Sequence, residues 1–239
     1  MKKDFLYEGK AKKLYTTDDP HIVLVIYKDD ATAFNRKKTG TILNKGVVNN
    51  RISNHFFQIL AGHGIPTHFI EELSERETLV KRVEIIPAEV IVRNQVAGSM
   101  ARRLGLEEGH ALAHSTIEFS YKKDELDDPL MADSYLTALN LCSQEELDQI
   151  KGMAFRINEI LQQEMLNIGI KLIDFKLEFG RTTADGQIVL ADEISPDTCR
   201  FWDAETHKKL DKDRFRHDLG GVEEAYQEMY YRLLGKTIG

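Results

Sequence analysis

The segment LIDFKLEFG, residues 172–180, alternates apolar and charged side chains. Because successive side chains of a β-strand point to opposite faces, this pattern predicts a strand with one apolar and one charged face. The apolar face would hold Ile173, Phe175, Leu177 and Phe179. The charged face would hold Asp174, Lys176 and Glu178. Two interpretations stay open: a solvated edge strand with a ladder of charges, or a strand whose charged face lines a site.

A partner strand is predicted over 187–192, because an Asp-Gly turn dipeptide precedes it. With a three-residue loop over 184–186, Asp192 would lie opposite Glu178. With a two-residue turn, Glu193 would take that place. Two facing carboxylates repel each other unless a cation lies between them, and oxygen ligands suit Mg²⁺, which keeps its other positions for water and phosphates. The hairpin therefore predicts a magnesium site whose exact ligands depend on the turn.

The first 96 residues are rich in short aromatic and β-branched runs separated by turn residues, which predicts strands. These runs are residues 5–7, 13–16, 22–27, 67–70, 79–86 and 88–96. One helix is expected between them, because apolar side chains recur at helical spacing from Val48 to Leu60. We therefore predict an antiparallel sheet with one packed helix, ending near Val96.

The second half has a different pattern. Its expected elements are a short helix over 98–104, a charged irregular stretch over 107–129, a long helix from 143 to 168, and a last helix over 222–233. The long helix has the clearest start, because Ser143 and Glu146 form a capping box. The chain is therefore predicted to be α+β, with a first domain over 1–96 and a second over 97–239.

Composition excludes several classes of protein. The 239 residues carry 32 Lys and Arg against 39 Asp and Glu, a net charge of −7, which argues against wholesale nucleic-acid binding. Charges interrupt every apolar run before it reaches the length of a membrane span, so no membrane partner is expected. Cys142 and Cys199 are the only cysteines, which is typical of a protein in the reducing cytoplasm.

The segment PAEVIVRNQVAGSM, residues 87–100, predicts a strand that passes through Gly98 and Ser99 into a helix. Backbone N–H groups, a serine hydroxyl and the nearby Arg93 together make a phosphate site. The alternative is that Ser99 only caps the helix and Gly98 only makes the turn. The pattern does not decide between them.

Two further stretches carry cationic side chains beside turns. In YEGKAKKLY, residues 7–15, Lys10 and Lys12 follow a glycine turn and could reach phosphates, although the Walker A spacing is absent and a solvated lysine-rich hairpin explains this stretch better when it is taken by itself. In DEISPDTCRFWD, residues 192–203, Arg200 follows a Ser-Pro-Asp turn. It is either a structural ion-pair partner or an anion clamp.

Taken together, these stretches closely resemble the SAICAR synthetase family of purine biosynthesis. The matching segments, in family order, are YEGKAK, ATAFN, IPAEVIVRNQVAGSM, LIDFKLEFG, ADEISPDTCRFWD and DKDRFR. The resemblance implies an ATP-dependent carbon–nitrogen ligase that joins L-aspartate to the carboxylate of carboxyaminoimidazole ribonucleotide, through an acyl phosphate. It also implies a kinase-like N-terminal antiparallel lobe, a larger mixed C-terminal lobe and an ATP cleft between them. Family members often form dimers, so a homodimer stays open.

The resemblance also assigns site residues. Those implied for ATP are Lys10, Ala11, Lys12, Lys81 and Ile85. Those implied for Mg²⁺ are Glu178 and Asp192. Those implied for the ribonucleotide are Arg93, Ser99, Asp197 and Arg200. Lys176, which would neutralise the substrate carboxylate or the transferring phosphoryl group, and Asp174 complete the implied catalytic set.

Two other functions compete with this interpretation. A small-molecule or protein kinase would also need ATP and metal carboxylates, but neither H-R-D nor D-F-G occurs in the chain. A noncatalytic nucleotide-binding module would carry the same charges only as surface. A requirement of ATP turnover for both other substrates separates the ligase from these two.

Overall fold

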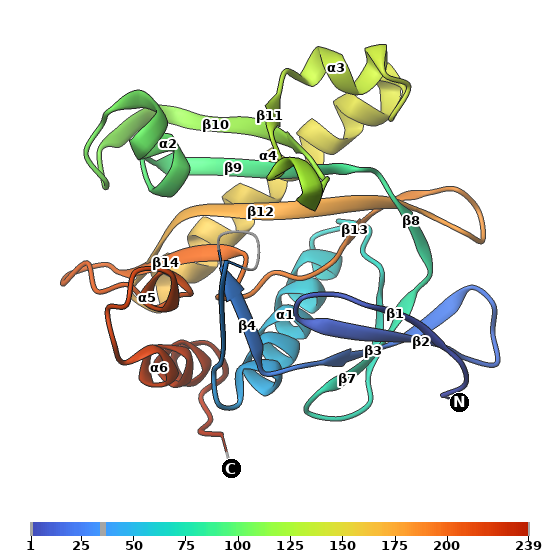
Figure 1. Cartoon of the computed structure of the whole chain (residues 1–239), viewed down its shortest axis with the longest axis horizontal. Coiled ribbons are helices and arrows are strands. Elements are labelled where there is room, and N and C mark those ends of the chain that lie inside the picture. Colours follow the sequence, from blue (N-terminus) through green and yellow to red (C-terminus); the bar gives the residue numbers. More distant parts are fainter. Residues whose placement is uncertain (1, 34–36, 239) are drawn as a thin grey trace.

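Strand β12, Ile170–Thr182, lies at the centre of the largest sheet in the computed structural model, which describes residues 2–33 and 37–238 (Figure 1). The strands run in the order β11-β10-β9-β12-β13, and β8 and β14 also pair with β12. Their bounds are β8 Val83–Ile85, β9 Ala88–Gln95, β10 Ala111–Tyr121, β11 Leu130–Met131, β13 Ile188–Ala191 and β14 Cys199–Asp203. Because β12 is paired on both sides, the solvated-edge interpretation is wrong.

The hairpin of β12 and β13 has a different register from either predicted one. Glu178 pairs with Ala191, and the loop spans the four residues between Thr182 and Gln187, which close the hairpin through the Thr182 N–H and the Gln187 carbonyl. Asp192 follows the end of β13 with a positive φ of 59°. Both predicted pairings, of Asp192 and of Glu193 with Glu178, are therefore wrong, because the loop is longer than the Asp-Gly signal indicates.

A register shift in β12 also breaks the predicted alternation. The pairing with β14 is irregular between Leu172 and Asp174. As a result Leu172 packs in the main core with Phe175, whereas Ile173 packs with Ala97 and Trp202 in a separate cluster. The prediction that Ile173 shares a face with Phe175 is wrong, because a bulge reverses the side-chain order locally.

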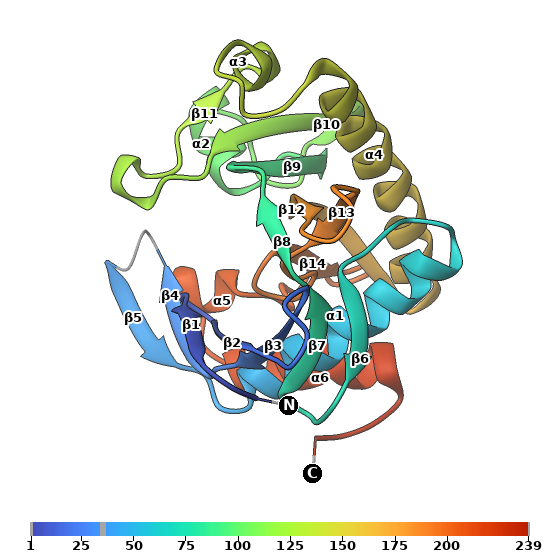
Figure 2. The ribbon, with the colours of Figure 1, turned by 90° about the vertical axis from the view of Figure 1, so that its right-hand side faces the viewer.

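A second sheet has the order β1-β2-β3-β7-β6. Its strands are β1 Phe5–Glu8, β2 Lys12–Thr16, β3 Ile22–Tyr27, β6 Phe69–Glu72 and β7 Glu77–Lys81, with α1 (Lys45–Gly62) against it. The prediction that one sheet runs on to Val96 is wrong, because β8 and β9 pair with β12. Figure 2 shows β8 leading from the lower part of the molecule to the upper one.

A small separate hairpin, which the sequence did not indicate, is formed by β4 (Asp30–Ala33) and β5 (Lys38–Thr41). The end of the ATAFN segment, Phe34 and Asn35, lies outside the described residues.

The prediction of an irregular stretch over 107–129 is wrong for its central part. Eleven of these residues form β10, which pairs with β9 and β11. Its polar side chains, such as His114 and Ser115, hide the period of two, and a register shift between Ala111 and Thr116 interrupts it further. Pairing with β9 thus overrides a weak local pattern. The short 3₁₀ helix Asp124–Leu126 follows.

The predicted helices are confirmed. They are α1 (Lys45–Gly62), α2 (Gly98–Leu104), α4 (Gln144–Asn167) and α6 (Val222–Leu234), while α3 (Asp133–Ala138) was not predicted and α5 (Asp213–Arg216) is a single turn. α4 covers the apolar face of β12, and α1 packs against α6. Among the described residues no helix is both long and apolar enough to cross a bilayer. Cys142 and Cys199 are free and buried.

The capping box at the start of α4 supports a stability prediction. The Glu146 N–H donates to Ser143 Oγ at 3.1 Å, and the Ser143 N–H donates to Glu146 Oε2 at 2.8 Å. We expect Ser143→Ala to lower the free energy of unfolding by about 1 kcal/mol, because one N-terminal amide loses its partner. Urea unfolding measures this. Ser134→Ala, at an exposed position inside α3, is the control. Equal stability of the two variants would contradict the prediction.

Candidate functional site

A cavity of about 1020 Å³ lies between the two larger sheets, and all thirteen residues assigned by the resemblance line it. The β1–β2 turn and strand β2 bring Lys10, Ala11 and Lys12; β7 and β8 bring Lys81 and Ile85; β9 and α2 bring Arg93 and Ser99. β12 brings Asp174, Lys176 and Glu178, and the chain after β13 brings Asp192, Asp197 and Arg200. Charged side chains from segments far apart in the sequence therefore line the same cavity.

Lys176 lies at the point where the two predicted metal carboxylates converge. Its Nζ donates to Glu178 Oε1 at 2.6 Å and to Asp192 Oδ2 at 3.0 Å. Burial lowers the pKa of this ammonium, but Asp192 and Glu178 outweigh it and hold the pKa well above its ordinary value. Glu178 and Asp192 are therefore not paired across the hairpin, but both carboxylates contact the same lysine.

Lys12 reaches the same cluster from β2. Its Nζ lies 2.5 Å from Asp192 Oδ1 and 3.2 Å from Glu193 Oε1. Burial raises the pKa of Asp192, but the Lys12 and Lys176 ammonium groups outweigh burial and hold it well below its usual range. Asp192 is therefore an anion in this site.

Lys122 is a further residue of this cluster, which the sequence did not indicate. This lysine follows β10, and its Nζ lies 2.6 and 2.5 Å from the two carboxylate oxygens of Glu178. Glu178 is 3% exposed, so two ammonium groups compensate a buried carboxylate. No local signal singles out Lys122, because its position depends on the strand that the sequence did not predict.

The donor set of this cluster fits a divalent cation. Glu178 and Asp192 both place an oxygen within 3.0 Å of one point, the Lys176 Nζ. Glu89 Oε1 lies 3.7 Å from the same nitrogen, but in the part of the chain that the structure describes no three His, Cys, Asp or Glu side chains are arranged to hold a metal ion together. Burial raises the pKa of Glu89. Carboxylate oxygens that converge on one point are ligands that Mg²⁺ accepts. A cation bound by Glu178 and Asp192 would replace their contacts with the Lys176 ammonium group.

A second group of charges lies around Arg93, which is 2% exposed. Its NH1 donates to Asp174 Oδ2 at 2.5 Å, its Nε to Glu118 Oε2 at 2.9 Å, and its NH2 to Ser99 Oγ at 3.0 Å. Ser99 is exposed at the start of α2. No side chain caps α2 at its N-cap, Ala97, so the interpretation that Ser99 caps the helix is wrong. The serine hydroxyl and the guanidinium instead lie together at the cavity wall.

Arg200 is an ion-pair partner, which is the first of the two roles that the sequence left open. Its NH1 lies 2.9 Å from both oxygens of Asp174, and its Nε donates to Asp213 Oδ2 at 2.8 Å. It also lines the cavity. Burial lowers its pKa, but the two carboxylates outweigh burial and raise it. An arginine held by two carboxylates and open to a cavity is suited to binding an anion.

Asp197 lies in a buried network that the sequence did not indicate. Its Oδ2 accepts from Lys45 Nζ at 2.7 Å and from Lys212 Nζ at 3.2 Å, and its Oδ1 accepts from Tyr226 Oη at 2.5 Å. Burial raises the pKa of Asp197, but the two lysines outweigh it, so the pKa is lowered. Burial lowers the pKa of Lys212, which lines the cavity. Asp197 thus orients Lys212.

The opposite end of the cavity is lined by β2, β3, β7 and β8 and is more apolar. Val23, Val25 and Val80 line it together with Lys81 and His68. Burial lowers the pKa of His68 to about 3, so its imidazole is neutral. Lys10 and Asp124 also line the cavity, and Lys10 Nζ donates to Asp124 Oδ1 at 2.7 Å. This end has the apolar walls that a planar base requires, and the charged end has the cations that phosphates require.

Comparison with known proteins gives concordant results. The SAICAR synthetase family model matches residues 5–233. The phosphoribosylaminoimidazole-succinocarboxamide synthases of Lachnoclostridium phytofermentans and Coprothermobacter proteolyticus are 59% and 60% identical to the chain, over 98% and 97% of its length and 99% and 98% of theirs. The crystal structure of the Ehrlichia chaffeensis enzyme of that name has a TM-score of 0.96 at 45% identity and covers 98% of this chain and 100% of its own. A type-2 SAICAR synthetase solved in complex with ADP has a TM-score of 0.94 at 46% identity, covering 99% and 100%.

Proposed function

The chain belongs to the SAICAR synthetase family, and on this premise we propose that it joins L-aspartate to carboxyaminoimidazole ribonucleotide at the expense of ATP. The products are the succinocarboxamide ribonucleotide, ADP and phosphate. The observation that carries the proposal is that one cavity combines a carboxylate–lysine cluster, an arginine–serine cluster and a more apolar end. A ligase that joins two anionic substrates and consumes ATP needs these three environments together.

The chemistry explains why so many cations are needed. A carboxylate is a poor acceptor for an amine, because oxide is not a leaving group. Transfer of the γ-phosphoryl group to a carboxylate oxygen forms an acyl phosphate and releases ADP. The aspartate nitrogen then attacks the carbonyl carbon, the carbon–oxygen bond to phosphate breaks, and the amine loses a proton. Several anions must therefore lie close together, and fixed cations offset their repulsion.

The parts of the cavity would have different roles in this reaction. Lys10 and Lys12, with the backbone of Ala11, would bind the ATP phosphates, and Lys81 and Ile85 would border the adenine. Mg²⁺ held by Glu178 and Asp192 would supply positive charge to the phosphates. Lys176, between those two carboxylates, would neutralise the reacting carboxylate or the transferring phosphoryl group.

The arginine end would bind the ribonucleotide phosphate through Arg93, Ser99 and Arg200. Both oxygens of Asp174 accept from these two arginines, which supports a positioning role for this carboxylate rather than contact with reacting atoms. Asp197 would act through Lys212. We also propose a cytoplasmic location, because both cysteines are free thiols.

The decisive experiment measures ADP formation by the purified protein with ATP and Mg²⁺. We expect ADP only when both carboxyaminoimidazole ribonucleotide and L-aspartate are present, in equal amounts with the succinocarboxamide. ADP formed with one of them alone and a stable phosphorylated product would favour a kinase. Calorimetric binding of ATP without any dependence on Mg²⁺, and without turnover, would favour a noncatalytic module.

A further inference from the structure

Asp213, the first residue of α5, is a fully buried carboxylate with two arginine partners. Its Oδ2 accepts from Arg200 Nε at 2.8 Å, and its Oδ1 accepts from Arg216 NH1 at 2.8 Å. Both arginines line the cavity, and each is bound by a different oxygen of this carboxylate. Burial raises the pKa of Asp213, but the two guanidinium groups outweigh burial and lower it, so Asp213 is an anion. One carboxylate therefore sets the distance between two cations of the site.

The backbone of Asp213 is itself held in place by the side chain of Asp211. Its N–H donates to Asp211 Oδ1 at 2.8 Å, and Asp211 Oδ2 accepts from the Phe201 N–H at 2.9 Å. Phe201 follows Arg200 directly in β14. Asp211 thus ties the start of α5 to the strand that carries Arg200. Hydrogen bonds through Asp211 and Asp213 therefore connect the segments that carry the two arginines.

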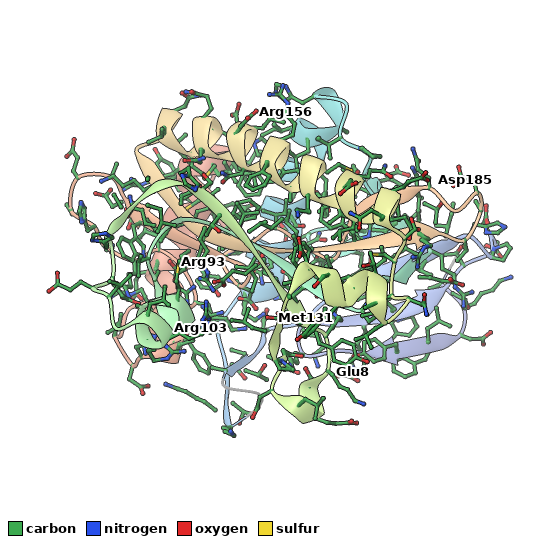
Figure 3. The ribbon with its side chains drawn as sticks, turned by 90° about the horizontal axis from the view of Figure 1, so that it is seen from above. Glu8, Arg93, Arg103, Met131, Arg156 and Asp185 are labelled. Carbon is green, nitrogen blue, oxygen red and sulfur yellow. The ribbon has the colours of Figure 1, made fainter. Side chains whose placement is uncertain are left out.

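Arg200 also continues a chain of alternating charges beyond Asp213. On its other side Asp174 accepts from Arg200 and from Arg93, and Glu118 accepts from Arg93 and from Arg103. Figure 3 shows Arg93 and Arg103 close together beside α2. From Arg216 to Arg103 this chain contains four arginines and three carboxylates, which leaves one excess positive charge for an anionic ligand.

The orientation of Arg200 leaves one of its nitrogens for a ligand. Nε and NH1 are bonded to Asp213 and Asp174, and within residues 2–33 and 37–238 NH2 donates no hydrogen bond. NH2 lies against Gly98, where an added Cβ would be only 2.2 Å away, and the φ of Gly98 is +53°. Arg200 can lie here only because Gly98 has no side chain.

We propose that Asp213 is a positioning residue for phosphate recognition, which orients Arg200 and Arg216 toward the phosphate of the ribonucleotide. The inference rests on the proposed function, because that phosphate is the ligand. Asp213 contacts neither the phosphate nor the reacting atoms. It acts by fixing two guanidinium groups before the ligand arrives, so that binding does not have to order two long side chains.

The test compares the natural protein with Asp213→Asn, which keeps the size of the side chain but removes its charge and offers an N–H group to a guanidinium. We expect the KM for carboxyaminoimidazole ribonucleotide to rise between about 10- and 100-fold, with kcat and the KM for ATP little changed. With the matching riboside, which lacks the 5′-phosphate, the two proteins should bind equally weakly by calorimetry. A purely structural role of Asp213 predicts losses that do not depend on the phosphate.

Asp203→Asn is the matched control. Asp203 also binds an arginine, Arg232, at 2.8 Å, but neither residue lines the cavity. We expect its ribonucleotide KM to match that of the natural protein. A KM unchanged in Asp213→Asn, or raised equally in both variants, would overturn the inference.

Gly98→Ala tests the same geometry if Asp213→Asn does not fold. The added methyl group displaces the Arg200 guanidinium while every charge remains, so the same phosphate-dependent rise in KM is expected. An unchanged KM here would also overturn the inference. Failure of the natural protein to form the succinocarboxamide would instead overturn the proposed function, so the two failures are distinguishable.

Discussion

Glu178→Gln is expected to lower kcat by at least about 100-fold while the protein still folds. The change is isosteric, but an amide carries no charge. Glu178 is buried, and its two oxygens compensate Lys122 and Lys176 and contribute to the proposed metal site. Without this charge, Mg²⁺ loses one of its two proposed ligands and the two lysines lose their common partner. Initial rates of succinocarboxamide formation measure the loss, and circular dichroism verifies the fold.

Glu84→Gln is the control for this prediction, because Glu84 is an exposed glutamate of β8 outside the cavity lining. Its kcat should equal that of the natural protein. The variants also differ in metal dependence: calorimetry should show Mg²⁺-dependent ADP binding in Glu84→Gln and weak dependence in Glu178→Gln. Full turnover by Glu178→Gln would remove the basis for the metal assignment.

Arg93→Met should raise the ribonucleotide KM by roughly 30- to 1000-fold, which corresponds to a loss of about 2–4 kcal/mol of binding free energy. Arg93 donates to Asp174, Glu118 and Ser99 and lines the cavity. Methionine fills most of the buried volume, so the loss reports the missing guanidinium rather than a void. The KM for ATP should stay close to its natural value, because Arg93 belongs to the opposite end of the cavity.

Arg103→Met is a close control, because Arg103 shares the Glu118 carboxylate with Arg93 but does not line the cavity. It should leave the ribonucleotide KM nearly unchanged and lower stability only slightly, as an exposed ion pair contributes little. If both variants raised the KM equally, the effect would come from Glu118, and the assignment of Arg93 to the phosphate would be wrong.

Prediction from sequence was most successful where the signal is local. The capping box placed the start of the long helix at Ser143, and the helix begins there. It was least successful for β10, whose polar side chains carry no clear period, and whose strand conformation depends on pairing with β9. The bulge between Leu172 and Asp174 was likewise invisible, because no residue type marks it.

The candidate site divides in the same way. The alternation of Asp174, Lys176 and Glu178 was correct, and all three line the cavity. The residue predicted to pair with Glu178 across the hairpin was wrong, because the loop that sets the register is one residue longer than the three-residue loop that we expected. Lys122 and Lys45 belong to other elements, and nothing in their own neighbourhoods indicates that they compensate charges at the site. Asp213 lies in the family segment DKDRFR, but its two arginine partners are known only from the fold.

The sequence by itself determined the α+β class, the main helices, the charged strand and the family motifs, because each depends on side chains within a few residues of one another. The tertiary structure decided which charges meet. Lys176 lies between two carboxylates, and Asp213 lies between two arginines, through strand pairing and chain reversals that bring distant segments together. Coulomb interactions depend on distance in space, and that distance is a property of the folded chain.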